Sequence, residues 1–173
     1  MKITLRDIIG RIHRLNLIRH IYAKKTTAGL GLFLGQPAIL EYLITHNGCT
    51  QKEIADEMQI TAASIAITVK RMQKAGLLDR ITDESNQRCN KLFITVKGQE
   101  LSQKCKIEFD RMDLQMFAGF SEKDLEQLSQ YLDLIINNIS NEEFAGKTFF
   151  SLLALGNELD KKHKNLQEEQ RHD

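Results

Sequence analysis

Residues 61–78 read TAASIAITVKRMQKAGLL, and this stretch decides the fold class of the chain. Thr61 is a favourable helix N-cap, and Gly76 is placed to end the helix. The stretch carries three basic residues and no acidic one, although the formal net charge of the whole chain is only +1. Its other side chains are mostly Ala, Ile and Thr. It therefore predicts a slim helix over 61–75 with a basic outer face.

The inner face of this helix and the segment before it indicate a two-helix motif. Ile65, Val69 and Met72 recur at steps of four and three residues, so we expect them to face the core. The preceding segment TQKEIADEMQI, residues 50–60, begins with an S/T-x-x-E capping box. Two short helices separated by about three residues are typical of a helix-turn-helix.

After Gly76 the hydrophobic pattern changes from helical to alternating. LLDRIT at 77–82 and KLFIT at 91–95 flank the polar, turn-prone tip DESNQRCN. Two short apolar runs around such a tip predict a β-hairpin. The order helix, helix, hairpin is the plan of a winged helix-turn-helix.

The rest of the chain is predicted to be helical. Apolar residues recur at helical spacing in several segments, and only one proline, Pro37, interrupts them. The expected helices cover 5–28, the GQPAILEYLITHNG segment with Pro37 in its first turn, 95–119 and 121–139, and a weaker one covers FAGKTFFSLLALGNELDK.

Composition excludes several classes of protein. No apolar run approaches the roughly 18–20 residues that span a bilayer, and the charged N-terminus does not resemble a signal peptide, so we expect a cytoplasmic protein without membrane contact. Cys49, Cys89 and Cys105 form no CxxC pair, which predicts free thiols rather than disulfides or a zinc site. None of the motifs GxSxG, GxxxxGK(S/T), HExxH or helix-opening GxGxxG occurs, so no enzyme is predicted.

The predicted 61–75 helix suits duplex DNA. A major groove about 12 Å wide admits one helix, and small alanines allow close approach to base edges. Lys70, Arg71 and Lys74 can neutralise phosphates, and Arg88 at the hairpin tip can reach a minor groove. The alternative is an amphipathic helix whose basic face is merely solvated. The hairpin that follows at short spacing favours DNA binding.

The segments GQPAILEYLITHNGCTQKEIADEM, SIAITVKRMQKAGLLDR and DESNQRCNKLFITVKGQEL resemble the MarR family of bacterial winged-helix transcriptional regulators. The wing of that family usually reads Asp-x-Arg, followed seven residues later by Thr-x-x-Gly. Here Arg88 precedes Thr95 by seven residues, and Gly98 completes the pattern. The resemblance implies a dimer with interlocked terminal helices, a recognition helix in the major groove and a wing arginine in the minor groove. It also implies repression relieved by an effector.

Two positions depart from the family pattern. Asn86 replaces the wing aspartate, so any bond that holds Arg88 becomes a weaker neutral one. Ile67 stands where many relatives have a polar or basic side chain. It either touches a thymine methyl group or packs inside.

The predicted fold is mainly α with a small β-hairpin wing, built as a winged helix-turn-helix core with N- and C-terminal dimerisation helices. We expect dimerisation helices at 1–34 and 120–160, the DNA-binding lobe at 35–98, a connecting helix at 99–119 and a polar tail at 161–173. The candidate DNA-binding residues are Thr50, Gln51, Thr61, Ala63, Ser64, Ile67, Thr68, Lys70, Arg71, Arg88 and Lys91. The candidate dimer interface holds Leu5, Ile8, Ile12, Leu15, Phe149 and Leu152.

Three further sites remain hypotheses. Tyr22, Phe33, Tyr42 and His46 can line a small-molecule effector pocket or serve as ordinary core residues. His13 and His20 share a helix face, but no ligand set completes a metal site, so neither metal nor cofactor is predicted. Cys49 and Cys89 are candidates for redox switching, which needs an exposed thiol of low pKa. A winged-helix module that binds protein instead of DNA remains the alternative function.

Overall fold

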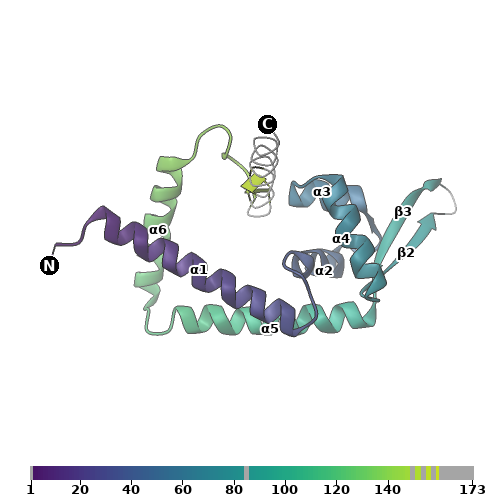
Figure 1. The fold of residues 1–173 in the computed structure, drawn as a ribbon, viewed down its shortest axis with the longest axis horizontal. Coiled ribbons are helices and arrows are strands. Elements are labelled where there is room, and N and C mark those ends of the chain that lie inside the picture. Colours follow the sequence, from purple (N-terminus) through teal and green to yellow (C-terminus); the bar gives the residue numbers. More distant parts are fainter. Residues whose placement is uncertain (1, 84–85, 149–150, 153–154, 157–158, 160–173) are drawn as a thin grey trace, which may run out of the picture. The chain divides into compact units, whose positions relative to one another are not determined.

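The computed structural model describes residues 2–83, 86–148, 151–152, 155–156 and 159, and the side chains of residues 83–89 lie outside this description. The elements are α1 (Leu5–Gly29), α2 (Gln36–Thr45), β1 (Cys49–Thr50), α3 (Gln51–Met58), α4 (Ala62–Lys74), β2 (Leu78–Asp83), β3 (Asn86–Ile94), α5 (Val96–Met116) and α6 (Glu122–Ile139) (Figure 1). The chain forms two compact units. One holds residues up to Cys49 together with Arg71–Met116, and the other holds Thr50–Lys70 and the chain from Phe117 onward.

The expected fold class is confirmed: the chain is mainly helical with a small antiparallel wing. Strands β2 and β3 pair from Leu78 opposite Ile94 to Thr82 opposite Asn90, and an irregularity follows Thr82. The two-residue strand β1 completes a three-stranded sheet in the order β1-β3-β2 and was not predicted. A strand this short carries no readable periodicity in the sequence.

In the first unit, α2 packs against α5 and β3. Leu40 and Leu43 on α2 and Leu92 on β3 are fully buried, which places the core of this unit around α2. Gln36 opens α2 and is also buried, and its side-chain oxygen accepts a 2.9 Å hydrogen bond from the Phe33 backbone N–H. The turn between α1 and α2 is therefore held by a buried side chain.

The Thr95-x-x-Gly98 segment joins the wing to the end of α4. The Thr95 hydroxyl donates to the Gly76 carbonyl at 2.8 Å and accepts from the Gly98 N–H at 3.1 Å, so one side chain caps α5 and binds the second residue after α4. A Cβ atom on Gly98 would lie 2.2 Å from the Leu77 carbonyl oxygen. The absence of a side chain at Gly98 therefore lets α5 approach the backbone that leads into β2.

In the second unit, Ile54 and Met58 of α3 and Ile65 and Val69 of α4 are buried, as the spacing predicted. Met72 on the last turns of α4 is buried as well and belongs to the first unit. These inner-face residues leave the opposite face of α4 to solvent.

The segment after α6 contacts the end of α3 in the second unit. The Thr148 hydroxyl donates to the Met58 carbonyl at 3.3 Å, and its backbone N–H donates to the Gln59 side-chain oxygen at 3.2 Å. Gln59 itself has a φ of 52°, the only positive φ of a non-glycine residue in the described chain. The expected last helix is observed at residues 151–152, 155–156 and 159, but its predicted start is wrong, because residues 144–148 form a turn and irregular chain. Phe149 and the 161–173 tail lie outside the described residues.

Candidate nucleic-acid interface

The two helices of the helix-turn-helix begin at side-chain caps. The Thr50 Oγ1 atom accepts from the Glu53 N–H at 3.2 Å and donates to Glu53 Oε2 at 2.9 Å, and the Thr50 N–H donates to the same carboxylate at 2.6 Å. This reciprocal capping box confirms the predicted start of α3. The Thr50 hydroxyl proton is therefore committed to the cap, although its oxygen was a candidate for DNA contact.

The three candidate hydroxyls on α4 differ in what they can still do. Thr61 Oγ1 accepts from the Ser64 N–H at 3.2 Å and donates to Ser64 Oγ at 2.9 Å, so Thr61 acts as the cap. Thr68 donates to the Ser64 carbonyl at 3.0 Å and keeps only acceptor capacity. The Ser64 hydroxyl accepts from Thr61, which leaves its own proton available to donate. Ser64 is therefore the best-placed donor of the three.

The outer face of α4 presents small side chains and one exposed isoleucine. Ala62, Ala63, Ser64 and Ala66 are exposed, which permits close approach of another molecule. Ile67 is 57% exposed. The alternative in which Ile67 packs inside is therefore wrong, because the neighbouring Ile65 and Val69 fill the inner face of the helix.

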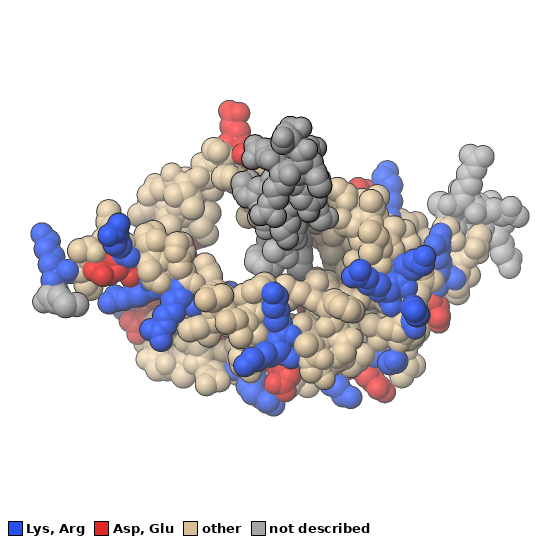
Figure 2. Space-filling view, viewed as in Figure 1, with Lys and Arg blue, Asp and Glu red and all other residues tan. Residues whose placement is uncertain are grey.

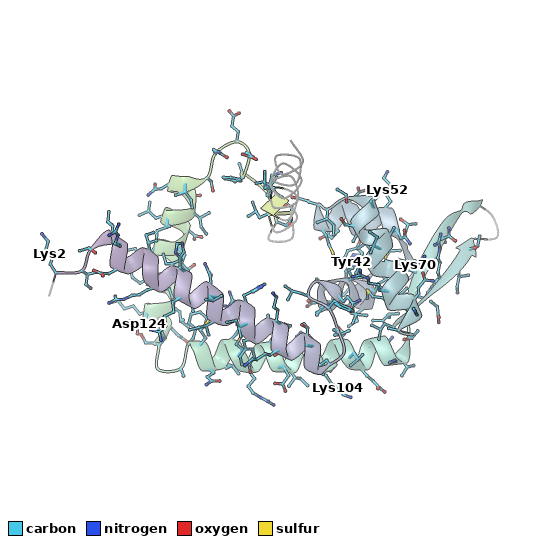
Figure 3. The ribbon with its side chains drawn as sticks, viewed as in Figure 1. Lys2, Tyr42, Lys52, Lys70, Lys104 and Asp124 are labelled. Carbon is cyan, nitrogen blue, oxygen red and sulfur yellow. The ribbon has the colours of Figure 1, made fainter. Side chains whose placement is uncertain are left out.

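The basic side chains of α4 lie on the same exposed side. Lys70, Arg71 and Lys74 are all exposed, and within the described part of the chain none of them has an acidic partner. Figure 2 shows Lys and Arg side chains gathered over α4, and Lys70 is labelled there in Figure 3. With no acidic side chain on α4 itself, this surface attracts anions.

Two contacts to α4 could not be anticipated from the sequence. The Lys97 Nζ atom donates to the Ala75 carbonyl at 2.7 Å and so satisfies a carbonyl just after α4. The guanidinium carbon of Arg71 lies 5.5 Å from the ring centroid of Phe33. Neither Lys97 nor Phe33 carries a sequence motif that points to α4, because each pair is brought together by packing.

The wing supplies further candidates. Lys91 is exposed on β3, opposite Ile81 on β2. The backbone of β3 passes through Arg88 and Cys89, but their side chains lie outside the described residues. Of the remaining candidates, Gln51 is half-buried at the start of α3, and the neighbouring Lys52, which the sequence analysis did not select, is exposed (Figure 3).

The expected dimer residues other than Phe149, which is not described, lie on apolar faces that the described part of the chain leaves largely exposed. Leu5 is 82% exposed, Ile8 and Leu15 are also exposed, and Ile12 is half-buried. Leu152 is exposed in the C-terminal part. No residue of α6 is buried, although Leu132, Ile135, Ile136 and Ile139 form an apolar stripe along it.

The four candidate pocket residues have different neighbours. Tyr42 and His46 stack with ring centroids 4.2 Å apart and planes 8° apart at the end of α2. Phe33 faces Arg71, and Tyr22 is half-buried on α1. The structure thus brings Tyr42 and His46 together, whereas Phe33 is engaged with a basic residue of α4.

The two cysteines whose side chains the structure describes do not offer the exposed thiol that redox sensing needs, and the side chain of Cys89 lies outside the described residues. Cys49 and Cys105 are both buried. Burial is the main cause that raises the pKa of the Cys105 thiol, and the Glu41 charge adds to it. Among the described residues no group of His, Cys, Asp and Glu could hold a metal ion, and no helix could cross a membrane.

Comparison with known proteins shows similarity to one family. The MarR family model matches residues 30–88, which cover α2, α3, α4 and part of the wing. Over these residues the chain is similar to the MarR family. It is similar to the helix-turn-helix-type transcriptional regulator YybA of Bacillus subtilis, with 25% identity over 113 residues, which are 65% of this chain and 75% of YybA.

Solved structures of MarR-type proteins share the fold. The crystal structure of the heme sensor protein PefR from Streptococcus agalactiae with heme covers 84% of this chain and all of PefR, with a TM-score of 0.64 and 19% identity. The MepR–DNA complex from S. aureus covers 74% of this chain and 96% of MepR, with a TM-score of 0.61 and 22% identity. The chain therefore shares its fold with these MarR-type proteins and is similar in sequence to transcriptional regulators of the helix-turn-helix type.

Proposed function

We propose that this MarR-family protein is a cytoplasmic homodimer that binds an inverted-repeat operator and represses transcription until an effector releases it. The observation that carries the proposal is the outer face of α4. It presents Lys70, Arg71 and Lys74 without acidic partners in the described chain, beside exposed Ala63 and Ser64. An acid-free helix with small side chains at its start fits a major groove.

The side chains of α4 divide into base contacts and phosphate contacts. The Ser64 hydroxyl has a proton to donate to a base or phosphate acceptor, and Thr68 keeps an acceptor oxygen. Exposed Ile67 can contact a thymine methyl group. Lys70 and Lys74 neutralise phosphates and release counterions. We assign Arg88 to the adjacent minor groove and Lys91 to the backbone.

Dimerisation explains the uncovered apolar faces of the terminal helices. Exposed leucines and isoleucines along α1 and α6 leave more apolar surface in water than a soluble monomer usually tolerates. Burial against the same surface of a second copy removes it from water and produces a two-fold axis. Two-fold symmetry in turn places two α4 helices on half-sites about one helical turn apart. The regions 1–34 and 120–160 are therefore assigned to the dimer and 35–98 to the DNA-binding lobe.

Two observations support control by an effector. The structurally similar PefR is a heme sensor, and the stacked Tyr42–His46 pair offers this chain an aromatic surface. We infer that an aromatic small molecule binds near this pair and lowers the affinity for DNA. Titration of the free protein and the protein–DNA complex with aromatic compounds tests this step, because a true effector must bind the two forms with different affinity.

The central experiment passes the purified protein over a library of random duplexes at moderate salt, followed by sequencing of the retained DNA. Enrichment of an inverted repeat supports the proposal, and Arg88→Ala should then weaken binding without a change in the dimer. A winged-helix module that binds protein is the rival function. It would retain no preferred sequence, and its partner affinity would lack the steep loss with salt that phosphate contacts impose.

A further inference from the structure

An exposed phenylalanine faces the recognition helix. Phe33 lies in the turn between α1 and α2 and is 62% exposed, so the core does not hold its ring. The Arg71 guanidinium carbon lies 5.5 Å from its ring centroid, within the range of a cation–π interaction. The position of Phe33 is explained by this contact rather than by the core.

The turn holds the Phe33 backbone in place. Its N–H donates to the Gln36 side-chain oxygen at 2.9 Å, and its carbonyl accepts from the Gln36 N–H at 3.1 Å. Gln36 is itself buried, and the preceding Leu32 is buried with its N–H bonded to the Thr27 carbonyl at 2.8 Å. The ring therefore projects from a backbone that is fixed on both sides.

An aromatic partner leaves the charge and the N–H donors of an arginine free to bind a ligand, whereas an acidic partner does not. A carboxylate would neutralise the guanidinium and occupy its N–H donors. A ring contacts the guanidinium through its π face and keeps the positive charge, so in-plane N–H donors remain for a phosphate. Restriction of a long side chain before binding also lowers the entropy lost when the complex forms.

We propose that Phe33 is a positioning residue that holds Arg71 ready for a DNA phosphate. The inference rests on the proposed DNA-binding function and extends it to a residue outside the helix-turn-helix. It gives Phe33 a role on the DNA side, different from the effector-pocket role expected from the sequence. Because the stabilising interaction is a cation–π contact at an exposed site, we expect its loss to weaken DNA binding about two- to fivefold for each bound copy.

A double-mutant cycle on the full-length protein tests the proposal. The probe is a labelled mixed-sequence duplex about three helical turns long at roughly 50 mM salt, where phosphate contacts dominate affinity. Phe33→Leu removes the π face and should weaken binding by the stated factor, whereas Phe33→Tyr should restore it. Leu34→Ala, an exposed apolar change in the same turn, is the matched control and should leave affinity unchanged.

The cycle is completed in the Arg71→Ala background, where Phe33→Leu should have no further effect, because the coupling between the two side chains is already lost. The proposal would be overturned if Phe33→Leu weakened DNA binding equally in both backgrounds. It would also be overturned if the Phe33→Leu single variant bound DNA with wild-type affinity. In those cases the proposed DNA-binding function still stands if the wild-type protein binds the duplex. Failure of the wild-type protein to bind any duplex at low salt would instead overturn DNA binding itself, and the proposal with it.

Discussion

Gly98 carries a strong steric constraint on how α5 meets the strand before it. A Cβ atom there would lie 2.2 Å from the Leu77 carbonyl oxygen and 2.8 Å from Ile94 Cγ1. The carbonyl cannot move freely, because it accepts from the Thr95 N–H at 3.1 Å. In Gly98→Ala, α5 must therefore shift away from the backbone that leads into the wing.

Two opposing effects determine how far Gly98→Ala lowers the free energy of unfolding. Replacement of a helical glycine by alanine gains up to about 1 kcal/mol of helix propensity. Forcing a methyl group into a packed contact costs typically about 1–3 kcal/mol, and a backbone neighbour places this case at the upper end. We expect the free energy of unfolding of Gly98→Ala to fall by about 2 kcal/mol net.

Urea unfolding followed by circular dichroism measures this change, at one fixed protein concentration because the stability of the proposed dimer depends on concentration. With a slope of about 2 kcal/mol per molar urea, the midpoint should fall by roughly 1 M. Gly29→Ala is the matched control, since a Cβ atom at Gly29 on α1 meets nothing within 4 Å. A Gly98→Ala midpoint equal to the wild-type value, or above it, would refute the steric reasoning.

Three further outcomes are expected. Lys70→Ala should lower the slope of log affinity against log salt by about one for each bound copy, which is about two for the proposed dimer, while Lys104→Ala on α5 leaves it unchanged; electrophoretic mobility shifts at several salt concentrations measure both. Leu15→Asp should convert the proposed dimer to monomer in sedimentation experiments, because it places a charge in the proposed interface; a stable dimer would remove α1 from that interface. The Ser121 hydroxyl and N–H hold the pKa of Asp124 below its usual 3.8, so this carboxylate stabilises α6 above that pH and the contribution is lost as the pH falls through the lowered pKa. The difference in thermal midpoint between the wild type and Asp124→Asn should therefore shrink in acid, and a constant difference would contradict the cap.

Elements whose signals are local could be predicted from the sequence. The caps at Thr50, Thr61 and Ser121 involve residues three positions apart, so their geometry follows from short-range hydrogen bonding. The inner face of α4 follows from helical periodicity alone. Strand β1 was missed because its two residues acquire their conformation only by pairing with β3.

The candidate site could be predicted only in part. The exposed, acid-free face of α4 is visible in the sequence as a run without Asp or Glu. Which hydroxyl groups of α4 can still donate a hydrogen bond is not visible in the sequence, because whether Thr68 donates to the Ser64 carbonyl depends on its rotamer. The exposure of Ile67 likewise required knowledge of which helix face is covered.

By itself the sequence determined the class of the molecule: its helices, the wing, the basic recognition helix and the family that these resemble. These features depend on periodicity, capping and composition, which act over a few residues. Only the tertiary structure decided that Phe33 contacts Arg71, that Lys97 binds the carbonyl after α4, and that Gly98 must lack a side chain. Each of these contacts joins residues more than 20 positions apart. Such pairs meet only when the chain packs, and no local pattern encodes which partners packing will bring together.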